Sequence, residues 1–268
     1  MKKQIADFPG SIGIGTWKIE SKKKMEIALH TAIENGCRVI DTASIYKNED
    51  LVGRVIAQLP MKREELFIQG KVWNKDRGYE KTLRAFDRTM KNLALSYLDC
   101  YMIHWPASPI FDREWESVNA ETYRAIEHLV EEKAVRTVGL CNFTVEHMES
   151  LKKTANRKPF VNQIELHPGC CQTEISDYCR KEGIALQAWS PLGNGVLLKH
   201  RELNRLAERY DVSPAKLCIL WAKQRGIFPI VKSVTEERIR ENCQQVSVMI
   251  SKDDMKVLNH FSTGSRNE

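Results

Sequence analysis

Polar side chains capable of acid–base chemistry stand where apolar segments of the sequence end. Asp41, Lys71 and His104 occur at the C-terminal ends of three consecutive apolar segments, and Tyr46 follows Asp41 by five residues. For any one of them a solvated loop or a structural hydrogen bond is the ordinary explanation, but their shared position favours a single site. A buried lysine requires an anionic partner, which Asp41 can supply. The Lys71 ammonium should then hold the pKa of Tyr46 below its usual value of about 10, because positive charge favours the phenolate. Tyr46 is therefore a predicted proton donor and acceptor.

The elements that must position these residues follow from an alternation along the chain. Eight short apolar, β-branched segments alternate with longer charged ones. Apolar residues on successive positions are typical of strands buried on both faces of a parallel sheet. The charged segments have apolar residues at three- and four-residue spacing, as in Leu83, Phe86, Met90 and Leu93, and indicate helices that pack on the sheet. The predicted strands are 12–17, 38–43, 66–73, 98–105, 135–143, 161–167, 185–192 and 226–233.

The number of strand–helix units predicts the fold class. Eight units without a Pro/Gly/Ser-rich linker fit a closed (β/α)8 TIM barrel, as one domain over residues 1–268, better than an open sheet. Residues 201–224 hold two helical segments divided at Ser213-Pro214, because Ser favours the N-cap and Pro the first helical position. The segment from Ser251, followed by Asp253 and Asp254, predicts an extra C-terminal helix. Active sites of such barrels lie where strands run into their following loops, which is where the candidate acid–base residues stand.

Composition and charge exclude several classes of protein. The chain is 42% hydrophobic and 28% charged, and 41 Lys and Arg against 35 Asp and Glu give a net charge of +6. The basic residues are scattered, so neither nucleic-acid binding nor a polybasic membrane anchor is indicated. No segment approaches the ~18 uninterrupted apolar residues of a membrane span, and the start of the sequence lacks the apolar core of a signal peptide. A cytoplasmic protein is expected.

The eight cysteines do not form a metal-binding pattern. No Cys-x-x-Cys occurs, and the adjacent Cys170 and Cys171 have only Cys179 and His167 nearby. A structural metal site needs paired ligands at short loop spacing. Reduced structural thiols are therefore expected, and no metal.

Several spaced motifs resemble those of the aldo-keto reductase family, its short microbial and protozoal members above all. They are Gly-Ile-Gly-Thr-Trp at 13–17, Asp-Thr-Ala with a following Tyr at 41–46, Lys-Val-Trp-Asn at 71–74, Ile-His-Trp-Pro at 103–106, Asn-Gln-Ile-Glu-Leu-His-Pro at 162–168, Trp-Ser-Pro-Leu-Gly at 189–193, and Lys-Ser-Val-Thr with Arg, Glu and Asn at 232–242. They occur in order across nearly the whole chain, so chance agreement is remote.

The resemblance implies a catalytic tetrad of Asp41, Tyr46, Lys71 and His104. Tyr46 would protonate a carbonyl oxygen as hydride reaches the carbonyl carbon. Lys71, paired with Asp41, would lower the pKa of Tyr46, and His104 would orient the carbonyl. From the residues alone, His104 could equally be a core histidine.

The resemblance also implies a nicotinamide cofactor. The ring would rest against Trp189, and the carboxamide would bind Cys141, Asn142 and Gln163, where Cys141 replaces the serine of many members and forms weaker hydrogen bonds. Lys232, Ser233 and Arg238 would bind the 2′-phosphate of NADPH, because a dianion favours guanidinium, ammonium and hydroxyl donors. Without Lys232 and Ser233, Arg238 would read as part of a solvated helix face. The remaining implied cofactor contacts are Thr16, Trp17, Ser190, Leu192, Val234, Glu241 and Asn242.

A substrate pocket is expected at the same end of the barrel. Trp17, Trp73 and Trp105 would line it together with Tyr46 and His104, although core packing is an equally ordinary role for any one tryptophan. The loop at 107–119, with Ile110, Phe111 and Trp115, would cover the pocket. Family members begin with a β-hairpin that plugs the barrel, which would be abbreviated or absent here, and the tail at 261–268 is short. A more open pocket and a broad substrate range follow as a hypothesis.

The leading hypothesis is an NADPH-dependent reductase of small-molecule aldehydes and ketones that acts as a monomer. One alternative is a cofactor-binding accessory subunit with little turnover, because some family relatives serve that role. Another is a barrel enzyme for phosphorylated sugars, which would need a glycine-rich phosphate loop. Gly193 and Gly195 give that reading weak support.

Overall fold

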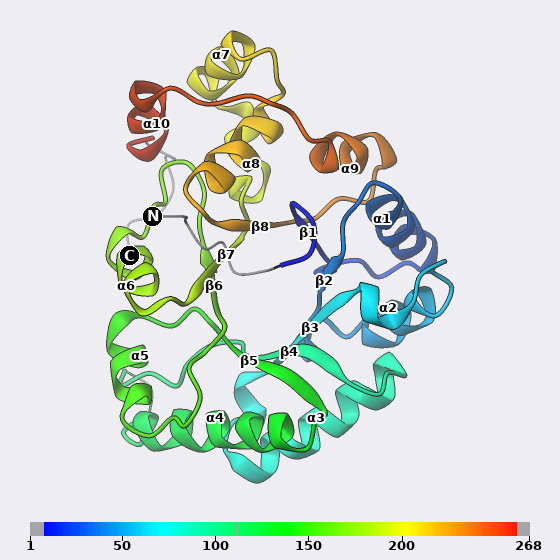
Figure 1. Cartoon of the computed structure of the whole chain (residues 1–268), viewed down its shortest axis with the longest axis vertical. Helices are drawn as coiled ribbons and strands as arrows, with labels where there is room; N and C mark the ends of the chain where they lie inside the picture. The colour runs from blue at the N-terminus through cyan, green and yellow to red at the C-terminus, as the bar shows by residue number, and fades with distance from the viewer. Residues whose placement is uncertain (1–7, 111, 262–268) are drawn as a thin grey trace.

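Eight parallel strands, each hydrogen-bonded to the next, close into a barrel in the computed structural model (Figure 1). The structure describes residues 8–110 and 112–261. The first strand pairs with the second and also with the last, through Gly13 with Ile230 and Ile14 with Val231. The (β/α)8 fold predicted from the sequence is confirmed. The strands are β1 Gly13–Gly15, β2 Val39–Asp41, β3 Phe67–Val72, β4 Leu98–Ile103, β5 Val135–Cys141, β6 Val161–Glu165, β7 Ala185–Trp189 and β8 Phe228–Val231.

Each strand lies inside its predicted segment, but every one of them is shorter than predicted. Residues 16–17, 42–43, 104–105, 142–143 and 190–192 already belong to the loops. The cause is that the apolar patterning continues past the last ladder hydrogen bonds, into loop residues that pack over the end of the barrel. Ala43 and Phe143, for example, are fully buried outside any strand.

The helices surround the strands in Figure 1. Ser213 caps the helix that begins at Pro214, accepting a hydrogen bond from the Lys216 amide, and Ser251 caps the last helix in the same way through the Asp254 amide. Both predicted starts are confirmed, as is the extra C-terminal helix. The helices are α1 Lys22–Glu34, α2 Glu49–Ile56, α3 Tyr79–Leu93, α4 Trp115–Glu131, α5 Val145–Lys152, α6 Thr173–Glu182, α7 Arg201–Arg209, α8 Pro214–Gln224, α9 Glu236–Cys243 and α10 Lys252–Asn259.

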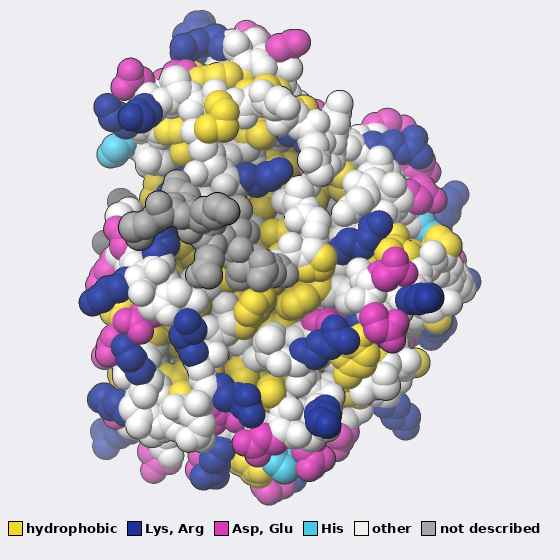
Figure 2. Space-filling view, in the orientation of Figure 1, with side chains coloured by type: hydrophobic (Ala, Val, Ile, Leu, Met, Phe, Trp, Pro, Cys, Tyr) yellow, Lys and Arg dark blue, Asp and Glu magenta, His cyan; other side chains and the backbone are white. Residues whose placement is uncertain are grey.

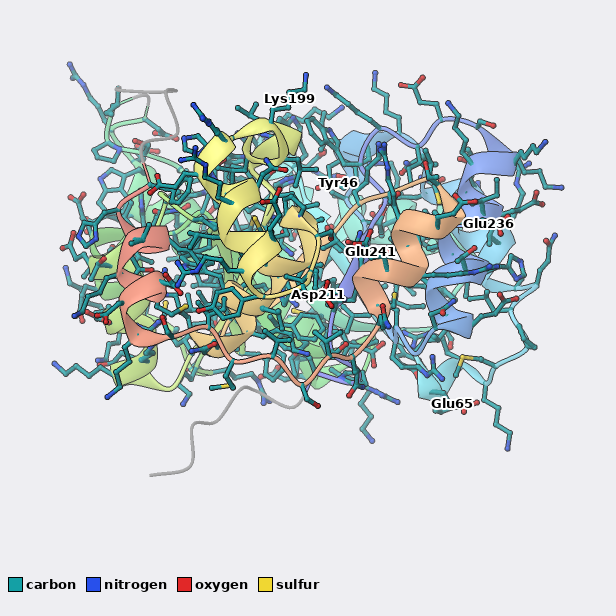
Figure 3. All side chains as sticks on the ribbon, turned by 90° about the horizontal axis from the view of Figure 1, so that it is seen from above. Tyr46, Glu65, Lys199, Asp211, Glu236 and Glu241 are labelled. Carbon is teal, nitrogen blue, oxygen red and sulfur yellow. The ribbon has the colours of Figure 1, made fainter. Side chains whose placement is uncertain are left out.

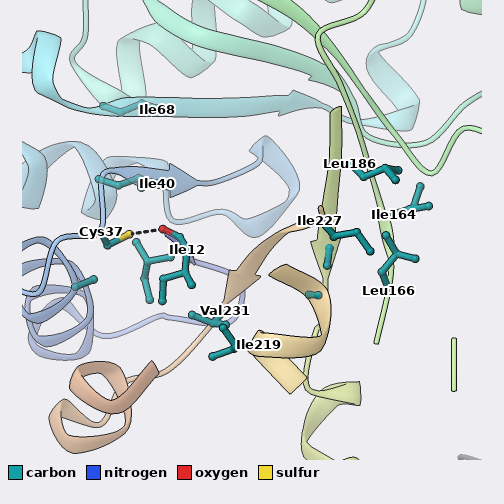
Figure 4. Close-up of a cluster of buried hydrophobic side chains, with 14 of the residues drawn as sticks. Ile12, Cys37, Ile40, Ile68, Ile164, Leu166, Leu186, Ile219, Ile227 and Val231 are labelled. Carbon is teal, nitrogen blue, oxygen red and sulfur yellow. Dashed lines mark hydrogen bonds between the residues drawn. The ribbon is translucent and has the colours of Figure 1, made fainter. Parts of the chain in front are cut away.

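The apolar core has two parts, because successive strand residues face opposite sides of the sheet. The larger part lies between strands and helices, and Figure 4 shows Ile40, Ile68, Ile164 and Leu186 within it. There the Cys37 thiol donates to the carbonyl of Ile12 at 3.3 Å. The smaller part fills the barrel interior and comes from the alternate strand positions Val39, Cys100, Met102, Val161, Phe228 and Ile230, together with Phe8 from the segment before β1.

A buried carboxylate braces the N-terminal end of the barrel, the end opposite the loops that follow the strands. Asp99, near the start of β4, accepts hydrogen bonds from Arg63 at 2.7 Å and from Arg136 at 2.9 Å. It also accepts one from the Ile68 amide at 2.8 Å. The two guanidinium groups lie over the ring of Tyr97, at 3.9 and 4.4 Å from its centroid. One side chain thus joins β4 to segments on both sides of it.

Charges of both signs are interspersed over the face of the molecule drawn in Figure 2. No helix within 8–110 and 112–261 is long and apolar enough to cross a membrane. All eight cysteines are free thiols. Among residues 8–12 no strand precedes β1, and the rest of the expected N-terminal hairpin region, residues 1–7, lies outside the described residues.

Candidate active site

Neighbouring parallel strands bring the candidate acid–base residues to one end of the barrel. Asp41 is the last residue of β2, Lys71 is next to last in β3, and His104 directly follows β4. Tyr46 ends a short 3-10 helix, Ser44–Tyr46, in the loop after β2. In the side view of Figure 3, Tyr46 lies toward the same end as Lys199, in the loop after β7, and Glu65, before β3, lies at the other end.

Lys71 is the centre of this arrangement and is fully buried. Its ammonium donates to Asp41 Oδ1 at 2.6 Å, to the Thr42 carbonyl at 3.3 Å and to the Tyr46 hydroxyl at 3.5 Å. Burial alone would lower the pKa of Lys71, but the net effect is to raise the pKa above its usual value, and the negative charge of the Asp41 carboxylate is the largest of the opposing effects. Lys71 is therefore a charged ammonium in contact with a tyrosine hydroxyl.

The predicted direction of the Tyr46 pKa is wrong. Burial raises the pKa of Tyr46 to about 12, and the opposing effect of the Lys71 ammonium is smaller. The sequence indicated the neighbouring charge, but it did not indicate how much water the surrounding loops exclude. Tyr46 is therefore a neutral phenol near neutral pH, able to donate a proton to an acceptor whose charge develops beside it.

His104 is also neutral. Burial, followed by the nearby Lys71 ammonium, lowers the pKa of His104 to about 3. Its ring meets those of Tyr46 and Trp73 edge-on, with centroids 5.8 and 5.1 Å apart. Its Nδ1 is buried and has no hydrogen-bond partner in the described part of the chain. A neutral imidazole beside a phenol can bind a carbonyl oxygen without competing as the acid.

The four residues expected to hold a nicotinamide come from β5, β6 and β7: Cys141 and Trp189 end β5 and β7, Asn142 follows β5, and Gln163 lies in the middle of β6. Asn142 has a left-handed backbone, with φ 63°, and its amide donates to the His104 carbonyl at 3.0 Å. Its oxygen accepts from the Trp189 indole at 2.8 Å. Cys141 is paired with Gln163 in the β5–β6 register, and its thiol lies 3.8 Å from the Gln163 side-chain oxygen. The structure thus brings these four together with the acid–base residues.

Three other expected cofactor contacts lie around the same end of the barrel. The Thr16 hydroxyl is buried and donates to the Asp41 carbonyl at 3.0 Å. Ser190, with φ 49°, donates to Asn194 at 2.8 Å. Leu192 is half-buried against the core. Ser190 and Leu192 are the more accessible of the three.

Lys232, Ser233 and Arg238 lie between the end of β8 and the first turns of α9. Lys232 and Arg238 are exposed, and neither forms an ion pair with a carboxylate of residues 8–110 or 112–261. Arg240, by contrast, pairs with Glu236 at 3.1 Å. Two unpaired cations and a hydroxyl are a donor set that suits a phosphate.

The other residues expected at the adenosine end differ in exposure. Val234 and Glu241 are half-buried, and Figure 3 shows Glu241 on α9 beside the barrel. Asn242 is buried, and its side-chain oxygen has no partner among the described residues. An unpartnered buried amide oxygen is available to a ligand that carries an N–H donor.

Two of the three predicted pocket tryptophans are exposed. Trp17 and Trp105 have 47% and 42% of their surface accessible, while Trp73 packs against His104. In the loop expected to cover them, Ile110 is 80% exposed, and Trp115 packs edge-on against His147 of α5 at 5.2 Å. Phe111 lies outside the described residues. The exposed indoles give the site an apolar rim.

Two buried glutamines near Asp41 were not among the site residues predicted from the sequence. Gln69 lies on β3 and Gln187 on β7, and both are completely buried. Each lies two residues before a predicted site residue on the same strand, Lys71 and Trp189. Since strand side chains alternate with a period of two, that spacing was the signal that could have identified them.

Comparisons with known proteins agree with this geometry. The model of the aldo/keto reductase family matches residues 11–262. Glyoxal reductase of Bacillus subtilis is 42% identical over 254 residues, which cover 95% of this chain and 89% of the relative. An aldo-keto reductase from a Medee basin deep-sea metagenome library has a TM-score of 0.88 and 37% identity, over 98% of this chain and 94% of that one. A Bombyx mori aldo-keto reductase, solved in complex with NADP, has a TM-score of 0.87 and 28% identity, over 96% of this chain and 90% of that one.

The family model and the relatives each span nearly the whole chain, and the closed barrel agrees with the similar solved structures. This chain therefore belongs to the aldo-keto reductase family and is an NAD(P)H-dependent oxidoreductase that acts on carbonyl compounds.

Proposed function

We propose that this protein uses NADPH to reduce small aldehydes and ketones to alcohols, with Tyr46 as the proton donor. The observation that carries the proposal is the contact of a fully buried Lys71 ammonium with both Asp41 and the Tyr46 hydroxyl, at 2.6 and 3.5 Å. The name of the Bacillus subtilis relative, glyoxal reductase, supports a small aldehyde as substrate.

Each of the four acid–base side chains has a separate role in the proposed reaction. When bound, the reduced nicotinamide supplies hydride to the carbonyl carbon. Tyr46 gives its proton to the carbonyl oxygen as negative charge develops there, and the Lys71 ammonium stabilises the phenolate that remains. Asp41 keeps Lys71 charged and in place. Neutral His104 donates one N–H to the carbonyl oxygen and orients it.

A preference for NADPH over NADH follows from the charges after β8. Lys232 and Arg238 are exposed cations without a carboxylate partner in the described parts of the chain, and the Ser233 hydroxyl lies between them in sequence. These three would hold the 2′-phosphate, which NADH lacks. Asn142 and Gln163 would bind the carboxamide, with Trp189 against the ring.

The proposed chemistry is tested by mixing purified protein with NADPH and a series of small aldehydes, and following the loss of reduced-nicotinamide absorbance. Tyr46→Phe should lower kcat by about 10²- to 10⁴-fold, the usual contribution of a positioned acid, and should still bind NADP+. Tyr79→Phe, which removes a hydroxyl from α3 away from the site, is the matched control and should react as the parent does. Equal turnover by the parent and Tyr46→Phe would reject the mechanism.

The cofactor preference is tested separately. Lys232→Ala combined with Arg238→Ala should raise KM for NADPH by about tenfold or more, because two charge-assisted contacts are lost. KM for NADH should change little. Arg240→Ala removes a cation from the same helix that already pairs with Glu236, and should leave both constants near those of the parent. Equal losses with the two cofactors would remove the 2′-phosphate assignment.

A further inference from the structure

Three glutamine side chains cross the barrel interior beneath Lys71. They are Gln69 of β3, Gln163 of β6 and Gln187 of β7, here called the glutamine belt, and each is at most 2% exposed. Gln69 and Gln163 both donate to Asp41 Oδ1, at 2.6 and 2.9 Å. Their second amide hydrogens go to the Gln187 side-chain oxygen, at 3.0 and 2.9 Å. Gln187 in turn donates to the Gln69 side-chain oxygen at 3.0 Å.

The charge of Asp41 determines which way each of these amides points. As the partner of the Lys71 ammonium, the Asp41 carboxylate can only accept hydrogen bonds. Gln69 and Gln163 must therefore present their NH2 groups to it. Gln69 and Gln163 then each have one N–H left for Gln187. Gln187 must therefore present its oxygen to these two N–H groups and its NH2 to the side-chain oxygen of Gln69. A reversed amide at Gln69 or Gln163 would bring two acceptors together in a site without water.

This pattern leaves one hydrogen-bond acceptor of the belt without a strong donor. Gln163 donates one amide hydrogen to Asp41 and the other to Gln187, whereas its oxygen has only the Cys141 thiol nearby, at 3.8 Å, among the described residues. A thiol is a weak donor. The Gln163 oxygen is thus fixed as an acceptor, and an amide N–H from a ligand is the group it would accept.

We propose that Gln69 and Gln187 are positioning residues that fix Gln163 with its oxygen directed to the carboxamide N–H of the cofactor, and so couple cofactor recognition to the Asp41–Lys71 ion pair. This inference rests on the proposed cofactor site. Neither Gln69 nor Gln187 touches the reacting groups. They act through Gln163 and Asp41, by removing the alternative amide orientations.

The test compares Gln187→Leu with Met102→Leu, a volume-conserving change in the apolar barrel interior. The first readout needs no cofactor: hydrogen exchange of the Gln163 side-chain NH2, whose NMR signal is identified by its loss in Gln163→Met. Exchange should accelerate by about tenfold or more in Gln187→Leu, because a buried hydrogen bond is removed, and should stay near that of the parent in Met102→Leu. Unchanged exchange in Gln187→Leu would overturn the inference.

The second readout is the Kd for NADP+, measured by quenching of tryptophan fluorescence, together with the pH profile of kcat. Gln187→Leu should raise Kd by roughly tenfold, as expected when a hydrogen-bond partner of an orienting group is lost, and should shift the pH profile, because Asp41 holds Lys71 less firmly. If Gln187 had only a structural role, Gln187→Leu would lower the melting temperature and leave the Kd for NADP+ and the pH profile of kcat unchanged.

A conservative variant completes the test. Gln187→Glu in its protonated form keeps an acceptor oxygen and an O–H donor at the same reach, so at mildly acidic pH it should recover most of the affinity lost in Gln187→Leu. If Gln187→Glu did not recover this affinity, the result would count against the proposed positioning role of Gln187. If the parent itself binds no NADP+, the proposed function fails, whereas the exchange of the Gln163 amide still decides whether the belt fixes that side chain.

Discussion

Burial sets the protonation state of the two aromatic side chains beside Lys71. It raises the pKa of Tyr46 to about 12 and lowers that of His104 to about 3. In both cases exclusion of water is the larger effect, and the Lys71 ammonium is the smaller one. The site therefore holds one ion pair, Asp41 with Lys71, and two neutral groups that can donate to a carbonyl oxygen.

The buried, neutral His104 makes stability depend on pH. The pKa of His104 is about 3 in the folded protein, against an ordinary value of 6.5, so between these values the unfolded chain binds more protons. Stability from this group is full above about pH 6.5 and is lost as pH falls toward 3. His104→Gln should flatten that part of the profile, as measured by urea unfolding at several pH values. Parallel profiles for parent and variant would contradict the neutral assignment.

For individual site residues, the sequence predicted which charged groups are paired better than it predicted the direction of a pKa shift. The Asp41–Lys71 contact followed from a lysine in an apolar strand, because a buried ammonium needs an anion. The direction of the Tyr46 pKa could not be predicted, since its burial depends on loops distant in sequence. Gln69 and Gln187 were missed although their alternation with Lys71 and Trp189 was visible. The roles of the site residues stay predictions.

Packing between helices depends on positions that no local pattern reveals. Ser213 and Ser251 were predicted as N-caps because capping involves only the next few residues. Gly53, inside α2, is different. A Cβ placed there would lie 2.2 Å from the Leu93 carbonyl oxygen at the end of α3, with that residue's backbone carbon atoms nearly as close. Glycine is needed at this position because α2 and α3 approach each other closely. The backbone conformation at residue 53 would allow other residues.

Gly53→Ala should therefore destabilise the protein by about 1–3 kcal/mol through overpacking, although alanine favours an isolated helix by about 1 kcal/mol over glycine. Urea unfolding measures the difference. Arg54→Ala, one residue along on the exposed side of α2, is the control and should change stability by less than about 0.5 kcal/mol. A stabilised Gly53→Ala variant would mean that α2 and α3 separate without cost.

The two ends of the barrel serve different purposes. The C-terminal end carries the acid–base residues, and the N-terminal end is braced by Asp99 with Arg63 and Arg136. The fold as a whole could be predicted because eight repeated units leave few alternatives. The Asp99 brace could not, because its two arginines come from separate loops and strands. The assignment of the whole chain to a single domain stays a prediction.

Asp99→Asn should lower the free energy of unfolding by about 1–3 kcal/mol, because it leaves the largely buried Arg63 guanidinium without its carboxylate, whereas Arg136 is exposed to water. At a temperature where the variant is still folded, kcat and KM for an aldehyde should match the parent. Unfolding by urea and steady-state kinetics on the same preparations measure both. A loss of kcat without a loss of stability would show that the two ends are not independent.

The pairing of β1 with β8 has a consequence for biosynthesis. Gly13 and Ile230 are neighbours in the closed barrel, yet roughly two hundred residues separate them along the chain, a contact of very high sequence separation. During translation β1 has no partner on that side until β8 has left the ribosome, so a nascent chain exposes two unpaired strand edges for most of its synthesis. The ring therefore cannot close before β8 is available, and a chain truncated before Phe228 would present open sheet edges to other chains in place of a completed barrel.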